Sequence, residues 1–361
     1  MGILDTIINT HQQESLQQFE LGLIIGKILE PLKEREKLIL AKRYGLQGQE
    51  MQTLKTVGEE QGLTRERVRQ IEKDLLKNLK TGVQQLESFI AARDLLVNTI
   101  AEHGGIMAEK SLLDYLGIDS EEEANAVKFI LNLIVELESH EEDEHIKQSW
   151  ARLGFDKQFL KEFLQETKKM LENHGKPLHP DQFIEKFKQS EFYKKNNLQL
   201  PEKVIINYLH ASAGVHRNPF GEFGLQHWNE IRPKDVGDKA YLVMKHHGKP
   251  EHYAVITDLI NQHALDKRTA YKETVHNKLI KDKRFVLVGR GIYALAEWGY
   301  KPGVVSDIIA EVLKDSSEPM SRDQIIEAVL KRRLVKKNTI LVGLSNRKLF
   351  QKVGKNLYAL A

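Results

Sequence analysis

The chain has 361 residues, of which 41% are hydrophobic and 29% are charged. This is an ordinary globular composition, and the length allows two or more domains. No apolar run approaches the roughly 20 residues needed to cross a bilayer, so we expect no membrane segment. Cysteine is absent, which excludes disulfides, thiolate metal ligands and a cysteine nucleophile.

The net charge is only +3, but the charge is unevenly distributed along the chain. Residues 31–80 carry 12 basic and 8 acidic side chains, residues 119–144 carry 1 and 10, and residues 301–361 carry 12 and 6. Two basic regions therefore flank an acidic one. We expect a polyanion to meet either basic region and to be repelled by the acidic segment.

Residues 1–30 are predicted to be an N-terminal helical segment, and residues 31–85 two short helices that meet at a glycine corner. Thr53 and Thr64 are the expected N-caps of these two helices. Gly58 is small enough to let the helices touch, and Gly62 supplies the positive φ of the corner. The second helix has one apolar stripe: Val68, Ile71, Leu75 and Leu79. This spacing predicts a helix-turn-helix.

The second helix, residues 64–80, begins with a crowd of long polar side chains. In a helix-turn-helix this end of the second helix enters the major groove. Arginine pairs there with guanine, glutamine with adenine, and glutamate accepts from cytosine. The crowding predicts a helix that reads base edges, with Lys73 further along expected on a phosphate. The alternative is a charged, solvated helix face, which the glycine spacing disfavours.

The stretch 32–80 resembles region 4 of the primary sigma factors of bacterial RNA polymerase. Three pieces carry the resemblance: REKLILAKRYGL, TLKTVGEE and TRERVRQIE. The resemblance implies a module that reads the −35 promoter element and docks on the flap of the polymerase β subunit. It departs from the family at Lys55, where glutamate is usual, and at Asp74, where alanine is usual; neither lies on the expected reading edge.

The resemblance also implies roles for single residues. The implied base readers are Arg65, Glu66 and Gln70. The implied backbone or supporting contacts are Arg35, Leu54, Lys55, Arg67 and Arg69. A full sigma factor needs an aromatic-rich helical region to melt promoter DNA, and some 30 residues with one aromatic side chain precede this module. We therefore expect that the chain cannot open a promoter as a sigma factor does.

The remainder of the chain repeats one pattern: a helix, a short extended piece, two helices and a two-stranded wing. Four stretches share it: IAEHGGIMAEKSLLDYLG, LENHGKPLHPDQFIEKF, MKHHGKPEHYAVITDLI and LKDSSEPMSRDQIIEAVL. They predict four tandem winged helices: 88–152, 157–230, 236–300 and 304–361. The third resembles the HARE-type winged helix of the polymerase delta subunit. The expected fold is thus mainly α with small β wings.

Two of these regions carry basic side chains suited to phosphate. In 236–300 we expect the third helix to begin near Thr269, with Lys272 beside it and Arg290 in the wing. In 304–361 the candidates are Lys336, Lys337, Arg347 and Lys348. The alternative is a solvated lysine-rich face, and the delta likeness favours protein contact for 236–300. The acidic region 88–152 is expected to contact protein or nothing.

The chain carries no recognisable catalytic or metal motif. His174/His179 and His247/His252 recur in the pattern H-G-K-P-x-H, but a zinc site needs about four ligands and no third ligand falls at fixed spacing. Glycine ending a helix explains the His-Gly pair better. A nucleophile elbow, P-loop or dinucleotide fingerprint is lacking. We therefore expect no metal, cofactor, small-molecule substrate or enzymatic activity.

The sequence favours a transcription factor that acts with bacterial RNA polymerase. Its expected partners are double-stranded DNA and the polymerase core, and its expected location is the cytoplasm, with the nucleoid. Two alternatives stay open. One is a scaffold of tandem winged helices that serves chromosome architecture or DNA defence. The other is a sigma antagonist whose acidic region mimics DNA.

Overall fold

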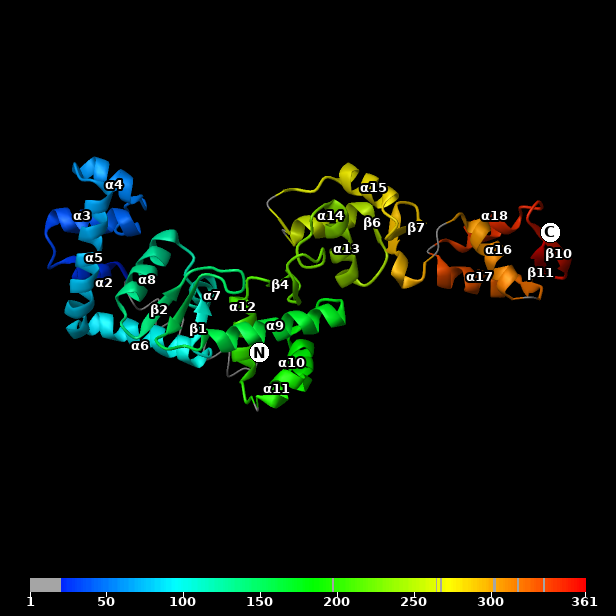
Figure 1. Ribbon diagram of the computed structural model, residues 1–361. Coiled ribbons are helices and arrows are strands. Elements are labelled where there is room, and N and C mark those ends of the chain that lie inside the picture. The colour runs from blue at the N-terminus through cyan, green and yellow to red at the C-terminus, as the bar shows by residue number, and fades with distance from the viewer. Residues whose placement is uncertain are drawn as a thin grey trace. The chain divides into compact units, whose positions relative to one another are not determined.

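The computed structural model describes residues 21–361 except 197, 264, 267, 301, 302, 317 and 334. These residues form two compact units. The first contains the chain up to residue 217 together with 223–226, and the second contains 218–222 and 227–361. Helices predominate, with small antiparallel sheets of two or three strands (Figure 1). Within the described residues, no helix has the length and apolar character that a membrane crossing requires.

The first compact unit begins with four helices: α2 (Leu21–Leu29), α3 (Glu34–Tyr44), α4 (Leu54–Gln61) and α5 (Arg65–Gly82). The first 20 residues of the expected N-terminal helical segment lie outside the described residues. In α2, Ile24 and Ile28 are buried, whereas Leu23 is 60% exposed. One face of α2 therefore belongs to the core of the unit.

The chain continues after a short 3-10 helix, η1 (Val83–Gln85), into the acidic region. Its elements are α6 (Glu87–Glu102), β1 (Ile106–Ala108), α7 (Glu109–Tyr115), α8 (Glu121–Leu133), β2 (Leu137–His140) and β3 (Ser149–Arg152). The central strand β3 is antiparallel to both neighbours, so that Trp150 lies opposite Met107 of β1 and Ser139 of β2.

One hydrophobic core joins α2, α3 and α5 to this acidic region. The helix α8 packs against all three. The ring of Phe129 in α8 meets the ring of Tyr44 edge-on at 5.0 Å, and the Gly48 N–H donates to Glu122 at 3.2 Å. The helices α2, α3 and α5 therefore share one core with the acidic region, whereas α4 packs on α3 and α5 through a separate small cluster.

The rest of the first unit packs onto that core through α12. The elements are α9 (Lys157–His174), α10 (Pro180–Gln189), α11 (Glu191–Lys195), α12 (Glu202–Ala211), β4 (Val215–Arg217) and β5 (Phe223–Leu225). The Asn207 amide donates to the carbonyls of His103 at 2.7 Å and Ile106 at 2.5 Å. The Tyr208 hydroxyl donates to the Gly104 carbonyl at 2.9 Å. The side of α12 that carries Asn207 and Tyr208 thus packs against the end of α6 and against β1.

The second compact unit contains two further regions, whose elements follow the order of the acidic region. The first has α13 (Val236–His247), β6 (Glu251–His252), α14 (Tyr253–Gln262), α15 (Lys272–Lys281), β7 (Phe285–Gly289), β8 (Ile292–Leu295) and the 3-10 helix η2 (Ala296–Trp298). The second has α16 (Val305–Asp315), β9 (Met320–Ser321), α17 (Arg322–Arg332), α18 (Lys337–Leu344), β10 (Phe350–Gly354) and β11 (Leu357–Leu360). Each has its own buried cluster.

Two local predictions can be compared with these elements. Gly175 and Gly248 end α9 and α13 with φ of 72° and 75°, which confirms helix caps at the His-Gly pairs. The predicted start of α15 near Thr269 is wrong, since the helix begins at Lys272. The Asn261 amide donates to the Ala270 carbonyl at 3.0 Å and accepts from the Ala270 N–H at 2.8 Å. These bonds hold Ala270 outside the helix.

Candidate nucleic-acid interface

The corner between α4 and α5 has the geometry that the sequence predicts. The Thr53 hydroxyl accepts from the Thr56 N–H, and that of Thr64 accepts from the Arg67 N–H, both at 3.2 Å. Each helix is therefore N-capped. Gly62 has a φ of 65°. A Cβ at Gly58 would lie 2.7 Å from the Leu63 carbonyl oxygen, so only glycine permits this close approach. Both glycine roles are confirmed.

A small apolar cluster fixes the angle between the helices. Ile39 of α3, Val57 of α4 and Val68 of α5 are buried together, with Leu54 and Leu63 packed against them. Burying Val68 turns the opposite side of α5 to solvent, because residues on the two sides of a helix alternate with its 3.6-residue period. The first two turns of α5 consequently present an exposed edge, which we call the reading edge (residues 65–67, 69 and 70).

Ion pairs and backbone contacts brace α3 against the other two helices. Arg43 Nε lies 3.2 Å from Glu72 Oε2 of α5, and the Arg43 guanidinium also donates to the Gln52 carbonyl. Lys42 pairs with Glu60 of α4. These contacts join the three helices at points away from the reading edge, so they support its orientation without covering it.

The side chains of the reading edge are exposed and mostly linked to one another. Arg69 donates twice to the Glu66 carboxylate, at 2.9 and 2.6 Å. Gln70 donates to the same carboxylate at 3.4 Å, and Arg67 donates to Gln70 at 3.4 Å. The bond from Arg69 lowers the pKa of Glu66 and raises that of Arg69. Glu66 therefore stays ionised, and its carboxylate is held in place by Arg69.

Arg65 and Lys73 differ from this linked set. Both are exposed, and neither side chain has a hydrogen bond or ion pair within the described residues. A guanidinium that is already unpaired can engage a base or a phosphate without breaking an internal bond. Among the predicted contacts on α5, Arg65 and Lys73 are consequently the side chains that can bind a ligand without first breaking an internal bond.

Three predicted supporting residues are engaged within the protein. Arg35 donates to the Gln61 carbonyl at the end of α4, at 2.6 Å. Leu54 is half-buried in the apolar cluster, and Lys55 lies 3.8 Å from Glu59 on the exposed side of α4. Leu54 thus has a packing role whether or not DNA is bound. The predicted DNA contacts of all three stay predictions.

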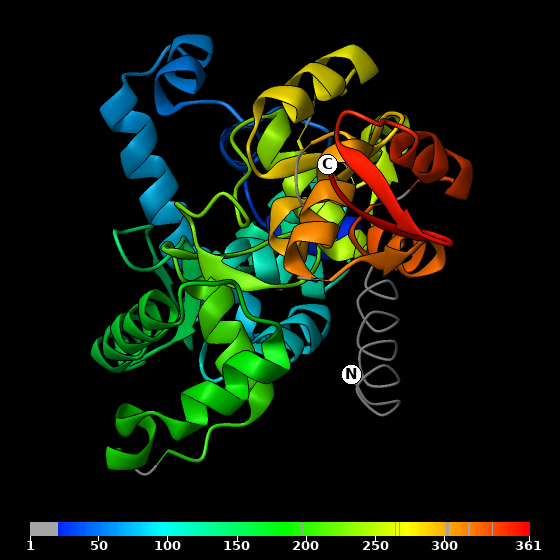
Figure 2. The same ribbon diagram turned by 90° about the vertical axis from the view of Figure 1, so that its right-hand side faces the viewer.

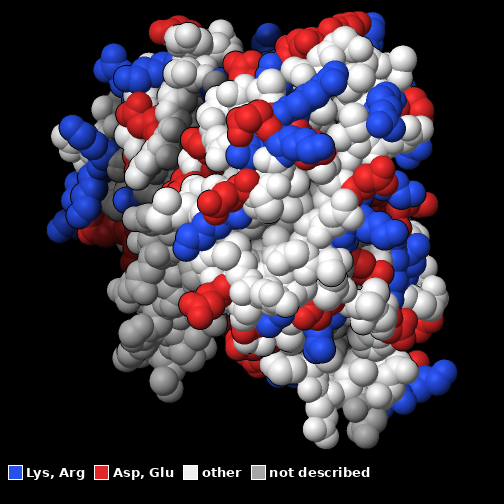
Figure 3. Space-filling view, turned by 90° about the vertical axis from the view of Figure 1, so that its left-hand side faces the viewer, with Lys and Arg blue, Asp and Glu red and all other residues white. Residues whose placement is uncertain are grey.

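Charge on this side of the first unit is mixed. Figure 3 looks at the molecule from the side on which α3 and α5 lie in Figure 1, and it shows basic and acidic side chains interspersed. On α5 itself, Arg69 is paired with Glu66 at 2.6 Å. A phosphate backbone would therefore be attracted by particular side chains rather than by one broad basic patch.

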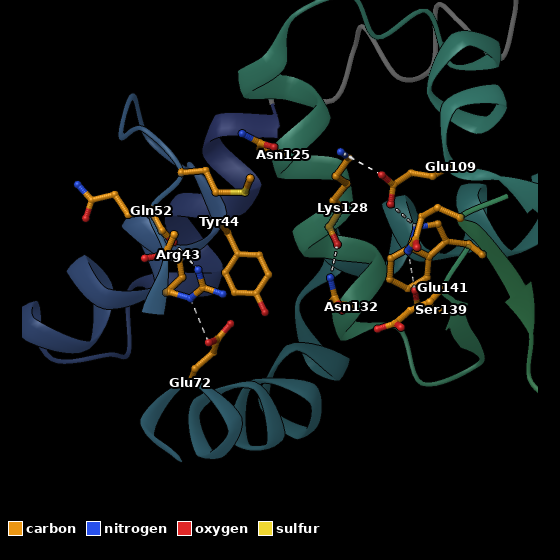
Figure 4. Close-up of a pocket in the computed structure, with 14 residues that line it drawn as sticks. Arg43, Tyr44, Gln52, Glu72, Glu109, Asn125, Lys128, Asn132, Ser139 and Glu141 are labelled. Atoms are coloured by element: carbon orange, nitrogen blue, oxygen red, sulfur yellow. Dashed lines mark hydrogen bonds and ion pairs between the residues drawn. The ribbon is translucent and has the colours of Figure 1, made fainter. Parts of the chain in front are cut away.

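A cavity of about 660 Å³ lies between α3, α5 and α8 (Figure 4). Arg43 pairs with Glu72 on one wall, and Lys128 pairs with Glu109 at 3.0 Å on the other. Burial, with help from Glu72, raises the pKa of Tyr44 between them. Because these four charged groups are already paired, they do not favour one class of ligand.

The basic candidates of the second compact unit are all exposed: Lys272, Arg290, Lys336, Lys337, Arg347 and Lys348. None of the six forms an ion pair within the described residues. Residues 328–361 contain nine lysines and arginines and no acidic residue. By contrast, the three described glutamates at the start of α8, Glu121–Glu123, make the corresponding helix of the acidic region unsuitable for phosphate.

Metal binding receives no support from the described part of the chain, where no group of three or more histidine, aspartate or glutamate side chains could hold an ion. His252, one of the histidines of the repeated H-G-K-P-x-H pattern, instead accepts from the Ala254 N–H at 3.2 Å and caps α14.

Comparison with known proteins adds a family likeness for the region of the reading edge. Residues 28–81 match the family Sigma-70, region 4. Over 71 residues the chain is 43% identical to RNA polymerase sigma factor sigB of Arabidopsis thaliana, covering 19% of this chain and 12% of that protein. Over 69 residues it is 39% identical to RNA polymerase sigma factor RpoD of Helicobacter pylori, covering 19% and 10%. The chain thus spans about a tenth of the length of these relatives.

The match agrees with the resemblance seen in residues 32–80, and this segment is a sigma-70 region 4 domain. Such a domain suggests DNA binding together with RNA polymerase. We call α3, α4 and α5 the sigma-4-like module from here on. The likeness concerns this part of the chain, so the role of the whole protein has to be argued from its other surfaces as well.

Proposed function

We propose that this chain is a DNA-binding transcription protein that acts with bacterial RNA polymerase, by binding rather than by catalysis. One observation carries the proposal: a sigma-4-like module whose capped, glycine-closed corner leaves Arg65, Glu66 and Gln70 exposed on the first turns of α5. Helix-turn-helix proteins insert this end of the second helix into the major groove.

Base reading at this edge follows from the hydrogen-bonding groups it presents. Arg65 is proposed to donate to guanine O6 and N7, and Gln70 to pair with adenine. Glu66, kept ionised by Arg69, accepts from cytosine N4. Lys73 and Arg67, with Arg35, Leu54 and Lys55, are proposed to hold the register on the backbone. The target is proposed to be a −35-like element.

The likeness to sigma region 4 supports a contact with polymerase, proposed to be the β flap. The apolar back of α3 and α5 is covered in this chain by α8. A polymerase element is therefore expected to meet the exposed polar surface of the module, or another region of the chain, rather than that apolar back.

The four repeated regions are proposed to be winged helices. Three of them share one element order; 157–230 departs from it, with an isolated bridge at Leu178 in place of the first strand and an additional helix, α11. For the last of them we propose phosphate contacts by Lys336, Lys337, Arg347 and Lys348, supported by the absence of acidic residues from 328 onward. For 236–300 we propose weaker contacts by Lys272 and Arg290. The array would extend binding along DNA on either side of a promoter element.

The proposal is tested by selecting duplexes from a random library with the full-length chain, with and without polymerase core. Arg65→Ala combined with Gln70→Ala should relax the selected sequence, each lost bidentate contact costing ~1–3 kcal/mol. A matched pair of exposed residues in the same compact unit, Arg152→Ala with Gln165→Ala, should leave the selected sequence unchanged.

Two outcomes would replace this proposal. If the first double variant selects the same sequence as the native chain, base reading by α5 is wrong, and lowered transcription without those side chains would favour a sigma antagonist. If native purification recovers an SMC-type ATPase or a nuclease in place of polymerase, the scaffold alternative is correct.

A further inference from the structure

The helices α8, α12, α15 and α18 hold equivalent places in the four repeated regions. In each, a buried leucine precedes the first residue of the next strand by the same interval: Leu131 and Leu137, Leu209 and Val215, Leu279 and Phe285, Leu344 and Phe350. The residue two places before that leucine lies roughly 200° around the helix, at the centre of its outward face. These central residues are Phe129, Asn207, Asn277 and Val342.

Two of the four outward faces are already occupied within the first compact unit. Phe129 is fully buried against Tyr44 of the sigma-4-like module. Asn207 is buried and donates to two backbone carbonyls of the preceding region. These two helices have therefore used their outward faces to join neighbouring parts of the chain.

The other two outward faces are exposed, and they differ in chemistry. The exposed face of α15 carries Glu273 beside Asn277, and Lys278 is paired at 2.7 Å with Asp235. The face of α18 has no acidic residue. At its centre Val342 is 71% exposed, more than any other large apolar side chain among the described residues. One exposed valine is ordinary on a protein surface, so the side chains and charges around it decide what this face can bind.

The side chains around Val342 are short and uncharged. Asn338, one turn earlier, and Thr339 are exposed, and neither side chain has a hydrogen-bond partner in the described part of the chain. The hydroxyl of Ser345 is turned onto the Val342 carbonyl at 2.6 Å. Short side chains let a helix approach the floor of a groove, whereas long charged ones would hold it away.

Cations surround this uncharged face. Lys336 and Lys337 begin α18, Arg347 and Lys348 follow it, and Lys352 lies in the exposed hairpin β10–β11, the red strands of Figure 2. Lys331 and Arg332 are paired with Glu327 and Asp315. From residue 336 onward the chain carries six cations and no acidic side chain, and these six complement a polyanion. A protein partner would have to be strongly acidic to match, so duplex DNA is the occupant that the charges favour.

We propose that α18 is a second sequence-reading helix of this chain and that it reads A·T base pairs in the major groove. Val342 packs on the C5-methyl group of thymine, and Asn338 pairs with N6 and N7 of adenine. The flanking lysines contact phosphates. This inference rests on the proposed DNA-binding function, and it adds base readout in a region for which the sequence predicted phosphate contacts alone.

The test uses the full-length chain and the duplexes selected as above. The selected sequence should contain two parts, one lost with Arg65→Ala/Gln70→Ala and one, rich in A·T, lost with Asn338→Ala. Within the second part, thymines are replaced by uracil, which removes the methyl group and keeps the base pair. The native chain should bind about fourfold more weakly to the uracil duplex. Val342→Ala should bind both duplexes equally.

Asn338→Ala should lose about tenfold in affinity for the selected duplex. Two variants serve as controls: Asn277→Ala, an exposed asparagine of α15 at the place equivalent to Val342, and Val255→Ala, an exposed valine of α14. Both should retain native affinity and the native response to uracil.

The outcomes separate this inference from the function on which it rests. If the native chain binds no duplex, the proposed function fails. If it binds, but Val342→Ala responds to uracil as the native chain does and Asn338→Ala selects the same sequence, base reading by α18 is wrong while the function stands. If Val342→Ala keeps DNA affinity and loses a copurifying acidic protein, the occupant is that protein.

Discussion

The helices α8 and α18 occupy the same place in two repeated regions and have opposite surroundings. Phe129, at the outward centre of α8, is fully buried against the sigma-4-like module, whereas Val342, its equivalent in α18, is 71% exposed. The same framework thus serves for internal assembly in the first compact unit and leaves a surface open in the second. Equivalent helices in a repeat array need their own chemistry examined before a common function is assigned to them.

The largest expected difference is in the effect on stability of replacing Phe129 or Val342 by alanine. Phe129→Ala should lower the free energy of unfolding of the first compact unit by ~3–5 kcal/mol, because it opens a cavity in the core that carries α3 and α5. Val342→Ala should change stability by less than ~0.5 kcal/mol. Hydrogen exchange of the two helices in denaturant measures both. Equal effects would mean that α8 is not part of that core.

A smaller difference is expected between two asparagines in equivalent places. Asn207→Ala removes the donor for the carbonyls of His103 and Ile106, which should cost ~1–3 kcal/mol of stability. Asn277→Ala, on the exposed face of α15, should cost almost nothing. Thermal denaturation of the two variants side by side tests whether the outward face of α12 is packed and that of α15 is exposed.

The packing of α12 should also depend on pH. Burial lowers the pKa of His210 to about 4, and the charges of Arg217 and Lys147 act in the same direction. The unfolded chain takes up this proton near pH 6.5. Because the unfolded chain binds this proton at a higher pH than the folded chain, the free energy of unfolding does not depend on His210 above pH 6.5. It falls as the pH falls from 6.5 toward 4, by ~1–3 kcal/mol in all.

Unfolding of the first compact unit, followed between pH 7 and pH 4, measures this dependence. His210→Gln should remove that part of the dependence, since it has no proton to take up. The residues that follow the equivalent leucines in α15 and α18, Ile280 and Ser345, do not titrate. An unchanged pH profile in the variant would show that other groups cause the loss.

The smallest expected effect concerns salt. Lys336→Ala with Lys337→Ala should weaken duplex binding evenly across sequences and flatten the dependence of log affinity on log salt by roughly 2. Lys168→Ala with Lys169→Ala, an exposed lysine pair on α9, should leave that slope unchanged. Titrations at several salt concentrations compare the two. If the two double variants show the same slope, Lys336 and Lys337 do not contact phosphate.

The corner of the sigma-4-like module could be predicted from sequence because its determinants are local. Threonine caps, a glycine at the close approach and a glycine with positive φ each act within a few residues. The Arg69–Glu66 pair was not predicted, although its spacing of three residues along a helix is a recognised signal. It changes Glu66 from an isolated carboxylate into one already oriented by a cation.

The packing of α8 could not be predicted from the sequence, for a different reason. The acidic count of residues 119–144 led us to expect contact with protein or with nothing. Within α8, Glu121, Glu122 and Glu123 all lie in the first turn, where negative charge favours the helix. The apolar residues that follow make the contact with α3 and α5. The net charge of the whole segment does not distinguish the acidic first turn of α8 from its apolar later turns. The tertiary contacts show that difference. Val342 was overlooked similarly, within a segment judged by its lysines.

The shared core has a practical consequence for anyone who wants to isolate the sigma-4-like module of this chain. The family match ends at residue 81, yet Leu40, Leu75 and Leu79 are covered by side chains that come from further along the chain. A fragment trimmed at the end of the match would present these leucines to water and should precipitate or self-associate. A soluble fragment has to retain α8 and the strands beneath it.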